Sequence, residues 1–165
     1  MRGLTGMSYG RYFGELRPGE AFRHWPGRTI NEYDDTLLNL LSMNQHPVHL
    51  DQHYAQNTQH GRRLVAGPTV ISIVIGMTQA DIGGRAIETL SYSDIRHTGP
   101  VFHGDTLHAN SIIVEAETLP GGRGAVTIET HATNQHQETV LSMRRKIIVP
   151  AAEETECQRC LSSRN

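Results

Sequence analysis

The sequence predicts an α+β domain in which an antiparallel β-sheet wraps round a long central α-helix. Three observations lead to this prediction. Residues 68–82 are apolar on almost every side and lie between Gly67-Pro68 and Gly83-Gly84. Helix-like patterns precede this run, and four strand-like segments follow it. An antiparallel sheet that covers such a helix is the simplest α+β arrangement of these elements.

The chain before the apolar run is expected to be extended at first and then helical. Residues 21–30 look extended, although Pro26 interrupts them. A helix is expected to begin near Thr29 or Asn31, because either side chain can cap it and acidic residues fill its first turn. It is expected to end near Met43, before the chain turns at a proline.

Two further helices are expected. Asp51 can cap a short one that runs to about Asn57, although its carboxylate can instead orient a histidine. The β-branched residues of 68–82 would also suit a buried strand, but 15 residues are too many for a typical one. Proline at the first helical position and glycine after the last are typical of a helix, so a buried central helix is expected.

The second half of the chain has the pattern of an antiparallel meander. The four expected strands cover residues 86–95, 106–119, 124–134 and 139–149. In the third, apolar and polar residues alternate, so one face is expected to be buried. A glycine-rich turn at 120–124 joins the second strand to the third.

The composition favours one domain without a nucleic-acid or membrane partner. The chain has 165 residues, which fits a single domain, expected at 11–150 with flexible ends at 1–10 and 151–165. Its 15 Lys and Arg against 17 Asp and Glu give a net charge of −2, without the basic excess of a nucleic-acid-binding protein. No apolar run approaches the ~20 residues of a membrane span, and no secretory signal is visible, so the expected location is the cytoplasm.

The two cysteines, Cys157 and Cys160, form a C-x-x-C near the C-terminus. A zinc site would need two more ligands, and a thioredoxin-like motif would open a helix within a βα unit. Their neighbours are polar, so the pair is expected to be two free thiols in a frayed tail.

The segment 44–51 gives the strongest indication of chemistry. It places two imidazoles, an amide and a carboxylate round Pro47. Histidine is the side chain whose unperturbed pKa allows proton exchange near neutral pH. Proline fixes its own φ and restricts the residue before it, so His46 and His49 are expected on a stiff turn. The chain has 10 histidines, so clustering by chance is the alternative.

Four motifs, in one order, resemble those of a known family. They are Thr29-Ile30-Asn31-Glu32-Tyr33-Asp34, His46-Pro47-Val48-His49-Leu50-Asp51, Ala66-Gly67-Pro68 and Thr98-Gly99-Pro100-Val101-Phe102-His103-Gly104-Asp105-Thr106-Leu107. Over residues 11–149 the chain resembles the MaoC-like dehydratases, which hydrate or dehydrate coenzyme A thioesters on the hotdog fold. The resemblance implies an acyl-CoA substrate, no cofactor or metal, and a homodimer or higher homo-oligomer.

The family pattern Asp-x-Asn-Pro-x-His implies roles for the histidine segment. His49 falls on the catalytic histidine, Asn44 on the aspartate and His46 on the asparagine. An asparagine cannot accept a proton as a base, although it can hold a water or orient an imidazole. His49 is then the expected general base, and His46 a second acid/base group or a substrate ligand. Lost activity is the alternative.

The family also has an oxyanion donor at the glycine that falls on Gly67. A backbone N–H at a helix N-terminus suits the enolate oxygen of a reacting thioester. The family commonly has histidine before this glycine and no proline after it, where this chain has Ala66 and Pro68. Because Pro68 has no N–H, Gly67 is expected to donate alone or with help from elsewhere. The alternative is a simple helix start.

A branched dicarboxylic thioester is the expected substrate. The Asn44 variant and the stretch 94–100 are similar to the subgroup that acts on itaconyl-CoA or mesaconyl-CoA. A second carboxylate needs a cation, and arginine can pair with it through two hydrogen bonds. The candidate substrate-binding residues are Arg62, Arg63, Arg96 and His97. A solvated surface position is the alternative for each arginine.

Asp105 and the other histidines are expected to be structural. Asp105 has the setting of a turn residue, and no metal-ligand spacing is visible. The histidines expected at the surface or in the sheet are His24, His53, His60, His108, His131 and His136.

The expected function is a lyase that adds water to a short enoyl-CoA thioester or removes it from a 3-hydroxyacyl thioester. A thioesterase on the same fold is one alternative, but it usually needs a carboxylate near the central helix, and residues 66–79 contain none. A non-catalytic acyl-CoA-binding protein is the other, because Asn44 stands where an acid is expected.

Overall fold

A computed structural model of the chain describes residues 9–151. The Cys157 and Cys160 pair, and most of the two ends expected to be flexible, lie outside these residues. At both ends of the described range, the backbone is hydrogen-bonded to the rest of the fold. The Gly10 N–H donates to the Ala80 carbonyl (2.8 Å), and the Ala151 N–H donates to the Gly122 carbonyl (2.8 Å).

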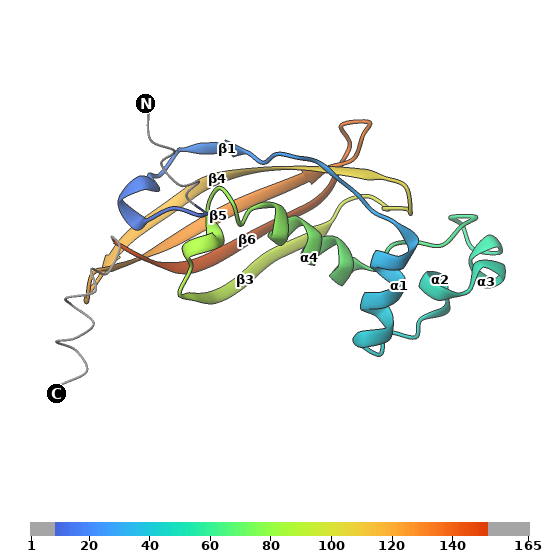
Figure 1. Cartoon of the computed structure of the whole chain (residues 1–165). Helices are drawn as coiled ribbons and strands as arrows, with labels where there is room; N and C mark the ends of the chain where they lie inside the picture. Colours follow the sequence, from blue (N-terminus) through green and yellow to red (C-terminus); the bar gives the residue numbers. More distant parts are fainter. Residues whose placement is uncertain (1–8, 152–165) are drawn as a thin grey trace, which may run out of the picture.

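One antiparallel sheet dominates the described residues (Figure 1). Its strands are β1 (Ala21–Arg23), β2 (Arg28–Thr29), β3 (Glu88–His97), β4 (Thr106–Leu119), β5 (Arg123–Thr133) and β6 (Thr139–Pro150). The order across the sheet is β1-β4-β5-β6-β3, and β2 pairs with β4. The predicted antiparallel sheet is confirmed, and β4, β5 and β6 follow one another as a meander. The predicted four-strand meander is wrong for β3, which pairs with β6 and not with β4, because the chain crosses over between β3 and β4. Only β3 is clearly displaced, because the N–H of Ala86 still closes the preceding turn on the Gly83 carbonyl (2.9 Å).

The core lies between the sheet and one side of the central helix, α4 (Gly67–Met77). Val70 and Val74 of α4 are almost wholly buried against strand residues such as Leu107 and Leu141. Along β6, Leu141 belongs to this core, whereas the alternate residue Arg144 is exposed. Fully burying one Val or Leu stabilises the fold by about 1.5–3 kcal/mol, so this layer fixes how α4 lies on the sheet.

The central helix is shorter and less buried than predicted. It ends at Met77, not at residue 82, and Thr78 caps it. The predicted complete burial of the helix is wrong for the single chain, because the sheet covers only one side of it. Ser72 and Gly76 on the other side are exposed. The apolar residues that flank the core side are only partly buried: Ile71, Ile73, Ile75 and Met77.

Three helices project from one end of the sheet (Figure 1). They are α1 (Glu32–Leu41), α2 (Pro47–Leu50) and α3 (Gln52–Gln56). Asn31 is the N-cap of α1, and Asp51 caps α3 by accepting the Tyr54 N–H (2.9 Å), so both predicted caps are confirmed. The stiff turn at Pro47 is a single helical turn, α2, which the sequence did not predict as a helix. Two short 3₁₀ turns complete the fold, η1 (Phe13–Glu15) and η2 (Gly83–Arg85).

Candidate functional site

His49 lies in α2 with its ring fixed by a backbone carbonyl. Its Nδ1 is 2.9 Å from the Leu64 oxygen, and the Leu64 N–H donates to the Val48 carbonyl (3.2 Å). Because a carbonyl can only accept, Nδ1 must carry the hydrogen. In the neutral ring, Nε2 then carries an unprotonated lone pair, as a general base requires.

His46 is the N-cap of α2 and presents the opposite atom. Its Nδ1 accepts the Val48 N–H (3.2 Å), so the neutral ring carries its hydrogen on Nε2. The ring centroids of His46 and His49 are 5.8 Å apart. One turn of helix therefore offers a proton acceptor and a proton donor close together.

Asn44 orients this segment through two hydrogen bonds. Its Nδ2 donates to Asn39 Oδ1 (2.9 Å), and its Oδ1 accepts the His46 N–H (3.4 Å). Asn39 is 1% exposed, and among the described residues its Nδ2 has no hydrogen-bond partner. No sequence motif singled out Asn39, which sits on the apolar helix α1.

The segment 64–67 connects His49 to the start of α4. The Leu64 carbonyl holds His49, the Val65 N–H donates to the Val101 carbonyl (2.9 Å), and the Ala66 N–H donates to Asp35 Oδ1 (3.0 Å). Gly67 follows as the first residue of α4, whose first N–H groups have no acceptor within the helix. The predicted base and the predicted oxyanion donor are thus held by one short segment of the chain.

His97, at the end of β3, packs against Gly67. A methyl group on Gly67 would lie 2.8 Å from His97 Nε2. Partial burial lowers the pKa of His97 below its ordinary 6.5, so the ring is neutral near neutral pH. The structure therefore brings His97, a predicted substrate-binding residue, to the predicted oxyanion donor, a contact that the sequence pattern did not predict.

Asp35 is a site residue that sequence reasoning missed. Its carboxylate is fully buried and accepts hydrogen bonds from Thr69 Oγ1 (2.7 Å) and His103 Nε2 (3.1 Å), besides the Ala66 N–H. In the sequence it is one of several acidic residues that begin α1. Such residues usually face solvent and complement the helix dipole, so nothing in the pattern signalled burial.

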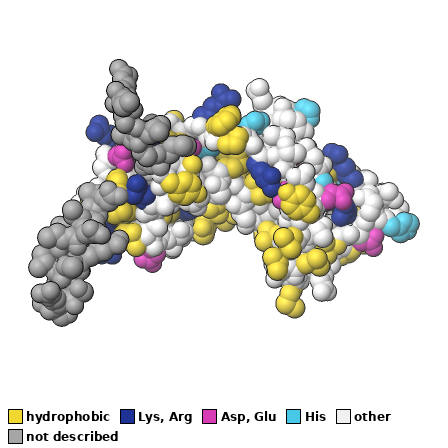
Figure 2. Space-filling model, viewed as in Figure 1, with side chains coloured by type: hydrophobic (Ala, Val, Ile, Leu, Met, Phe, Trp, Pro, Cys, Tyr) yellow, Lys and Arg dark blue, Asp and Glu magenta, His cyan; other side chains and the backbone are white. Residues whose placement is uncertain are grey.

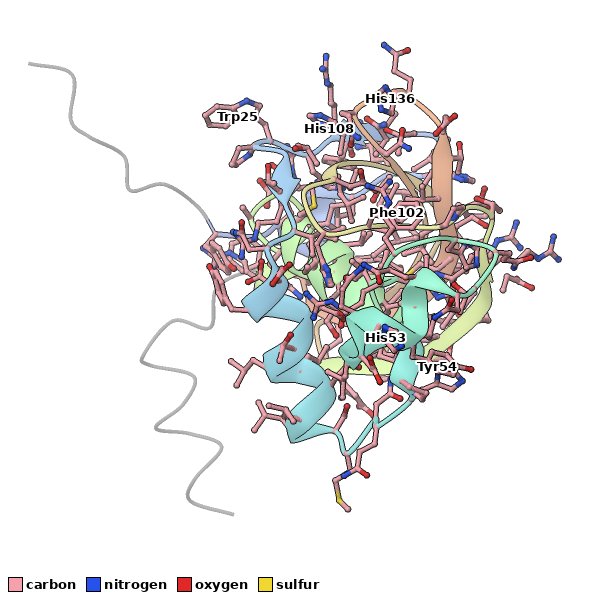
Figure 3. All side chains as sticks on the ribbon, turned by 90° about the vertical axis from the view of Figure 1, so that its right-hand side faces the viewer. Trp25, His53, Tyr54, Phe102, His108 and His136 are labelled. Carbon is pink, nitrogen blue, oxygen red and sulfur yellow. The ribbon has the colours of Figure 1, made fainter. Side chains whose placement is uncertain are left out.

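The three candidate arginines lie in different places. The Arg62 guanidinium stacks 3.7 Å from the ring centroid of Phe102, at a cleft of about 570 Å³. Phe102 pairs with Leu64, which brings Arg62 near the histidine segment, and Figure 3 shows Phe102 between α3 and the loop of His136 in that view. Arg63 pairs with Glu32 (2.8 Å).

Arg96 does not join the other site residues within this chain. It pairs in register with Ser142, on the outer face of the sheet, and lines a separate hollow with Glu129 and Arg144. Its neighbour His97 pairs with the core residue Leu141. Successive residues of a strand point to opposite faces, so Arg96 and His97 serve different surfaces.

The predictions for Asp105 and for the other histidines agree with the structure. Asp105 accepts the Phe102 N–H (2.8 Å) across the turn, as expected. The predicted surface histidines His53, His108, His131 and His136 are exposed, and His60 is half-buried. His24 is 2% exposed and lies in the sheet, not at the surface: it follows β1, and its N–H donates to the Ala109 carbonyl of β4 (3.0 Å). Its ring is held inside by Asp81 (2.7 Å) and Ser111 (2.8 Å).

Neither a metal site nor a membrane span is seen in the part of the chain that the structure describes. No group of three His, Cys, Asp or Glu side chains within residues 9–151 is placed to hold a metal ion. No helix in the same range is long and apolar enough to cross a membrane.

Comparisons with known proteins point to one family. The family model described as MaoC like domain matches residues 14–138. A mesaconyl-CoA hydratase from Cereibacter sphaeroides is 32% identical over 141 residues, covering 85% of this chain and 41% of that protein. A beta-methylmalyl-CoA dehydratase from Chloroflexus aurantiacus is 32% identical over 117 residues, covering 70% of this chain and 33% of that protein. The chain spans less than half the length of these relatives.

Solved structures share the fold. A putative MaoC domain protein dehydratase from Chloroflexus aurantiacus has a TM-score of 0.82 at 29% identity, over 90% of this chain and 44% of that one. An R-hydratase from Pseudomonas aeruginosa has a TM-score of 0.71 at 28% identity, over 88% and 92%. A Mycobacterium tuberculosis protein with a double hotdog fold has a TM-score of 0.79 at 23% identity, over 89% and 46%. The predicted α+β hotdog fold is confirmed.

Proposed function

We propose that this chain, which belongs to the MaoC-like domain family, adds water to a short enoyl-CoA thioester or removes it from a 3-hydroxyacyl thioester. One observation supports this most strongly: His49 Nδ1 is bonded to the Leu64 carbonyl (2.9 Å), three residues before the helix start at Gly67. A hydratase needs both a base for water and a donor for the enolate oxygen. The names of the relatives, a hydratase and a dehydratase, support the same reaction class.

The chemistry divides among three groups. His49 Nε2 takes a proton from water as the water oxygen attacks the β-carbon of the double bond. The displaced electron pair moves to the thioester oxygen, where the Gly67 N–H and the positive end of α4 stabilise the enolate. The enolate then collapses as the α-carbon takes a proton from His46 Nε2–H, and the proton that His49 took from water passes to His46 Nε2, so that both rings return to their neutral forms. Dehydration follows the same steps in reverse.

The substrate class that we propose is a branched dicarboxylic enoyl-CoA of the mesaconyl-CoA or itaconyl-CoA type. The mesaconyl-CoA hydratase relative supports it, and so does Arg62, an arginine for which the described residues provide no ion pair. Arg62 is the best candidate among the arginines, because Phe102, on which it stacks, pairs with Leu64. Arg63 already pairs with Glu32, and Arg96 faces the other side of the sheet.

A second copy of the chain is part of the proposal. Every residue of the edge strand β3 is exposed, and the open side of α4 is apolar. Figure 2 shows hydrophobic side chains gathered over α1. These are Tyr33, Leu37, Leu40, Leu41 and Met43, exposed by 56% to 80%. A helix as apolar as α4 is normally buried, so a partner is expected to cover its open side. A second copy would supply a second hotdog domain, as the double hotdog fold of the Mycobacterium tuberculosis protein does within one chain.

The oligomer prediction is tested by mass in solution. We expect light scattering to give at least twice the 18.3 kDa of the chain. Leu90→Lys and Tyr92→Lys on β3 should shift the mass towards one chain, whereas Thr127→Lys on the central strand β5 should not. A wild-type protein with the mass of one chain would contradict the prediction.

The function is tested by hydration assays on purified protein. Loss of enoyl absorbance is followed with crotonyl-CoA, mesaconyl-CoA and itaconyl-CoA in parallel, with thiol release recorded in the same samples. Turnover of the dicarboxylic substrates that Arg62→Ala impairs would support the substrate class. Turnover of crotonyl-CoA alone would contradict the proposed carboxylate-binding pocket but would still support the proposed hydration reaction. Thiol release without hydration would instead identify a thioesterase, and binding without any turnover a binding protein.

A further inference from the structure

Asp35 has no role in the reaction described above, yet it is a fully buried carboxylate beside the start of α4. Burying an ionised carboxylate is costly unless hydrogen bonds compensate for the lost water. Asp35 has three such bonds, from the Ala66 N–H (3.0 Å), Thr69 Oγ1 (2.7 Å) and His103 Nε2 (3.1 Å). The positive end of α4 adds a further favourable interaction.

The two bonds to Oδ1 come from either side of Gly67. Ala66 precedes Gly67 by one residue, and Thr69 follows it by two. The intervening Pro68 has no N–H at all. Among the described residues the Gly67 N–H itself has no hydrogen-bond partner, so the carboxylate fixes both flanks and leaves this donor open.

The third bond ties the same carboxylate to a second motif. His103 lies in the turn between Phe102 and Asp105, and the Gly104 N–H donates to the Ile30 carbonyl (2.8 Å). Ile30 itself is fully buried just before α1. Asp35 therefore joins α1, the start of α4 and this turn at one point in the interior.

We propose that Asp35 is a positioning residue for the thioester oxyanion. Its carboxylate holds the chain on both sides of Gly67 so that the Gly67 N–H stays directed at the thioester oxygen. The inference rests on the proposed function, because it assigns Asp35 to the acyl group of that reaction. Asp35 acts through Gly67 and does not itself touch the substrate.

Two pairs of variants, made in the whole chain, test whether Asp35 positions Gly67. Asp35→Ala removes all three bonds, whereas Asp35→Asn keeps an amide oxygen for Ala66 and Thr69. Thr69→Val removes one bond at nearly constant shape, and Thr69→Ser keeps it. Asp34→Asn is the matched control, because that neighbouring carboxylate accepts the Asn31 N–H (2.9 Å) at the cap of its own helix.

Three readouts separate positioning from folding. They are kcat, KM and the absorbance shift of bound sorbyl-CoA, a conjugated dienoyl thioester whose absorption moves to longer wavelength when its carbonyl accepts a hydrogen bond. We expect Asp35→Ala to lower kcat about 10²-fold, as a misplaced group does, with little change in KM and with loss of the shift. Asp35→Asn and Thr69→Ser should restore most of both, and Asp34→Asn should change neither.

Other outcomes overturn the inference. A folded Asp35→Ala protein with unchanged kcat, or with the sorbyl-CoA shift intact, would leave Asp35 only a structural role. If Asp35→Ala does not fold, Thr69→Val provides the test. An unchanged absorbance shift of sorbyl-CoA in Thr69→Val would show that Asp35 does not position Gly67. A wild type that shows neither hydration nor a shift overturns the function and the inference together. A shift without hydration in the wild type, lost in the variants, contradicts the function alone.

Discussion

His46 and His49 present opposite hydrogen-bonding atoms because different backbone groups bind their Nδ1 atoms. The Leu64 carbonyl makes Nδ1 of His49 a donor, and the Val48 N–H makes Nδ1 of His46 an acceptor. In the neutral rings, Nε2 is therefore a hydrogen-bond acceptor on His49 and a donor on His46, as the proposed roles of base and acid require. Hydration needs one of each, so the two roles need no carboxylate at Asn44.

The division of roles predicts unequal losses in the two alanine variants. His49→Ala removes the base and should lower kcat by roughly 10²–10⁴-fold with either hydration substrate. His46→Ala should lower it less, because solvent can replace a proton donor more readily than an oriented base. Steady-state kinetics and circular dichroism of both proteins check this. Collapse in His46→Ala, with little loss in His49→Ala, would reverse the assignment.

How far the sequence predicts the site depends on whether a residue acts through its own chemistry or through its burial. His49 and Gly67 could be predicted, because the motifs in which they stand resemble those of the MaoC-like family. Asp35 and Asn39 could not, since an acid in a first turn and an amide on an apolar helix look like surface residues. Which side of α1 is buried depends on contacts with residues far along the chain.

The contact between α4 and β3 is the element-scale feature that shapes the candidate site. The helix begins at Gly67, and the strand ends at His97, whose ring occupies the space where a side chain of residue 67 would lie. The sequence predicted both elements but not their contact, because it depends on where each one ends. The predicted helix extended to residue 82, whereas its C-terminal end lies at Met77.

This contact predicts that Gly67→Ala acts through His97. The added methyl would lie 2.8 Å from His97 Nε2, so the ring has to turn away from the helix start. We expect kcat to fall by about 10²-fold, as for other small misplacements. The free energy of unfolding should change by less than about 1 kcal/mol, because the ring end is free to move and alanine restricts the unfolded chain.

A double-mutant cycle with His97→Ala provides the control. Residues in contact have non-additive effects, so Gly67→Ala should cost little further activity once His97 is absent. Kinetic measurements on the wild type, both single variants and the double variant are sufficient. Fully additive losses would mean that the methyl group obstructs the substrate itself, without help from His97.

At the scale of the whole molecule, one sheet covers one side of one helix. The sequence predicted a helix buried on every side, and its composition supports that, but the described chain leaves Gly76 exposed. The predicted and observed burial differ because a helix face buried by a second copy has the same apolar residues as one buried in the core of a single chain. The sequence pattern could therefore predict the fold, but not which apolar face the single chain buries and which a second copy would cover.

The stability of the whole protein should fall in two stages as the pH is lowered. Partial burial lowers the pKa of His97 below 6.5, so the unfolded chain binds the proton more readily. Stability then rises with pH across this window and falls on acidification from neutral pH. The hydrogen bond from Arg144 lowers the pKa of Glu129 below 4.5, so its contribution is present above that value and is lost as the pH falls through the folded pKa.

Urea unfolding at a series of pH values checks both stages. His97→Gln should flatten the upper stage and leave the lower one, whereas Glu129→Gln should do the reverse. His97 is exposed and Glu129 is only half-buried, so the steps should be small and the lower one should shrink in high salt, which screens surface pairs. An upper stage that survives His97→Gln would contradict its assignment to His97.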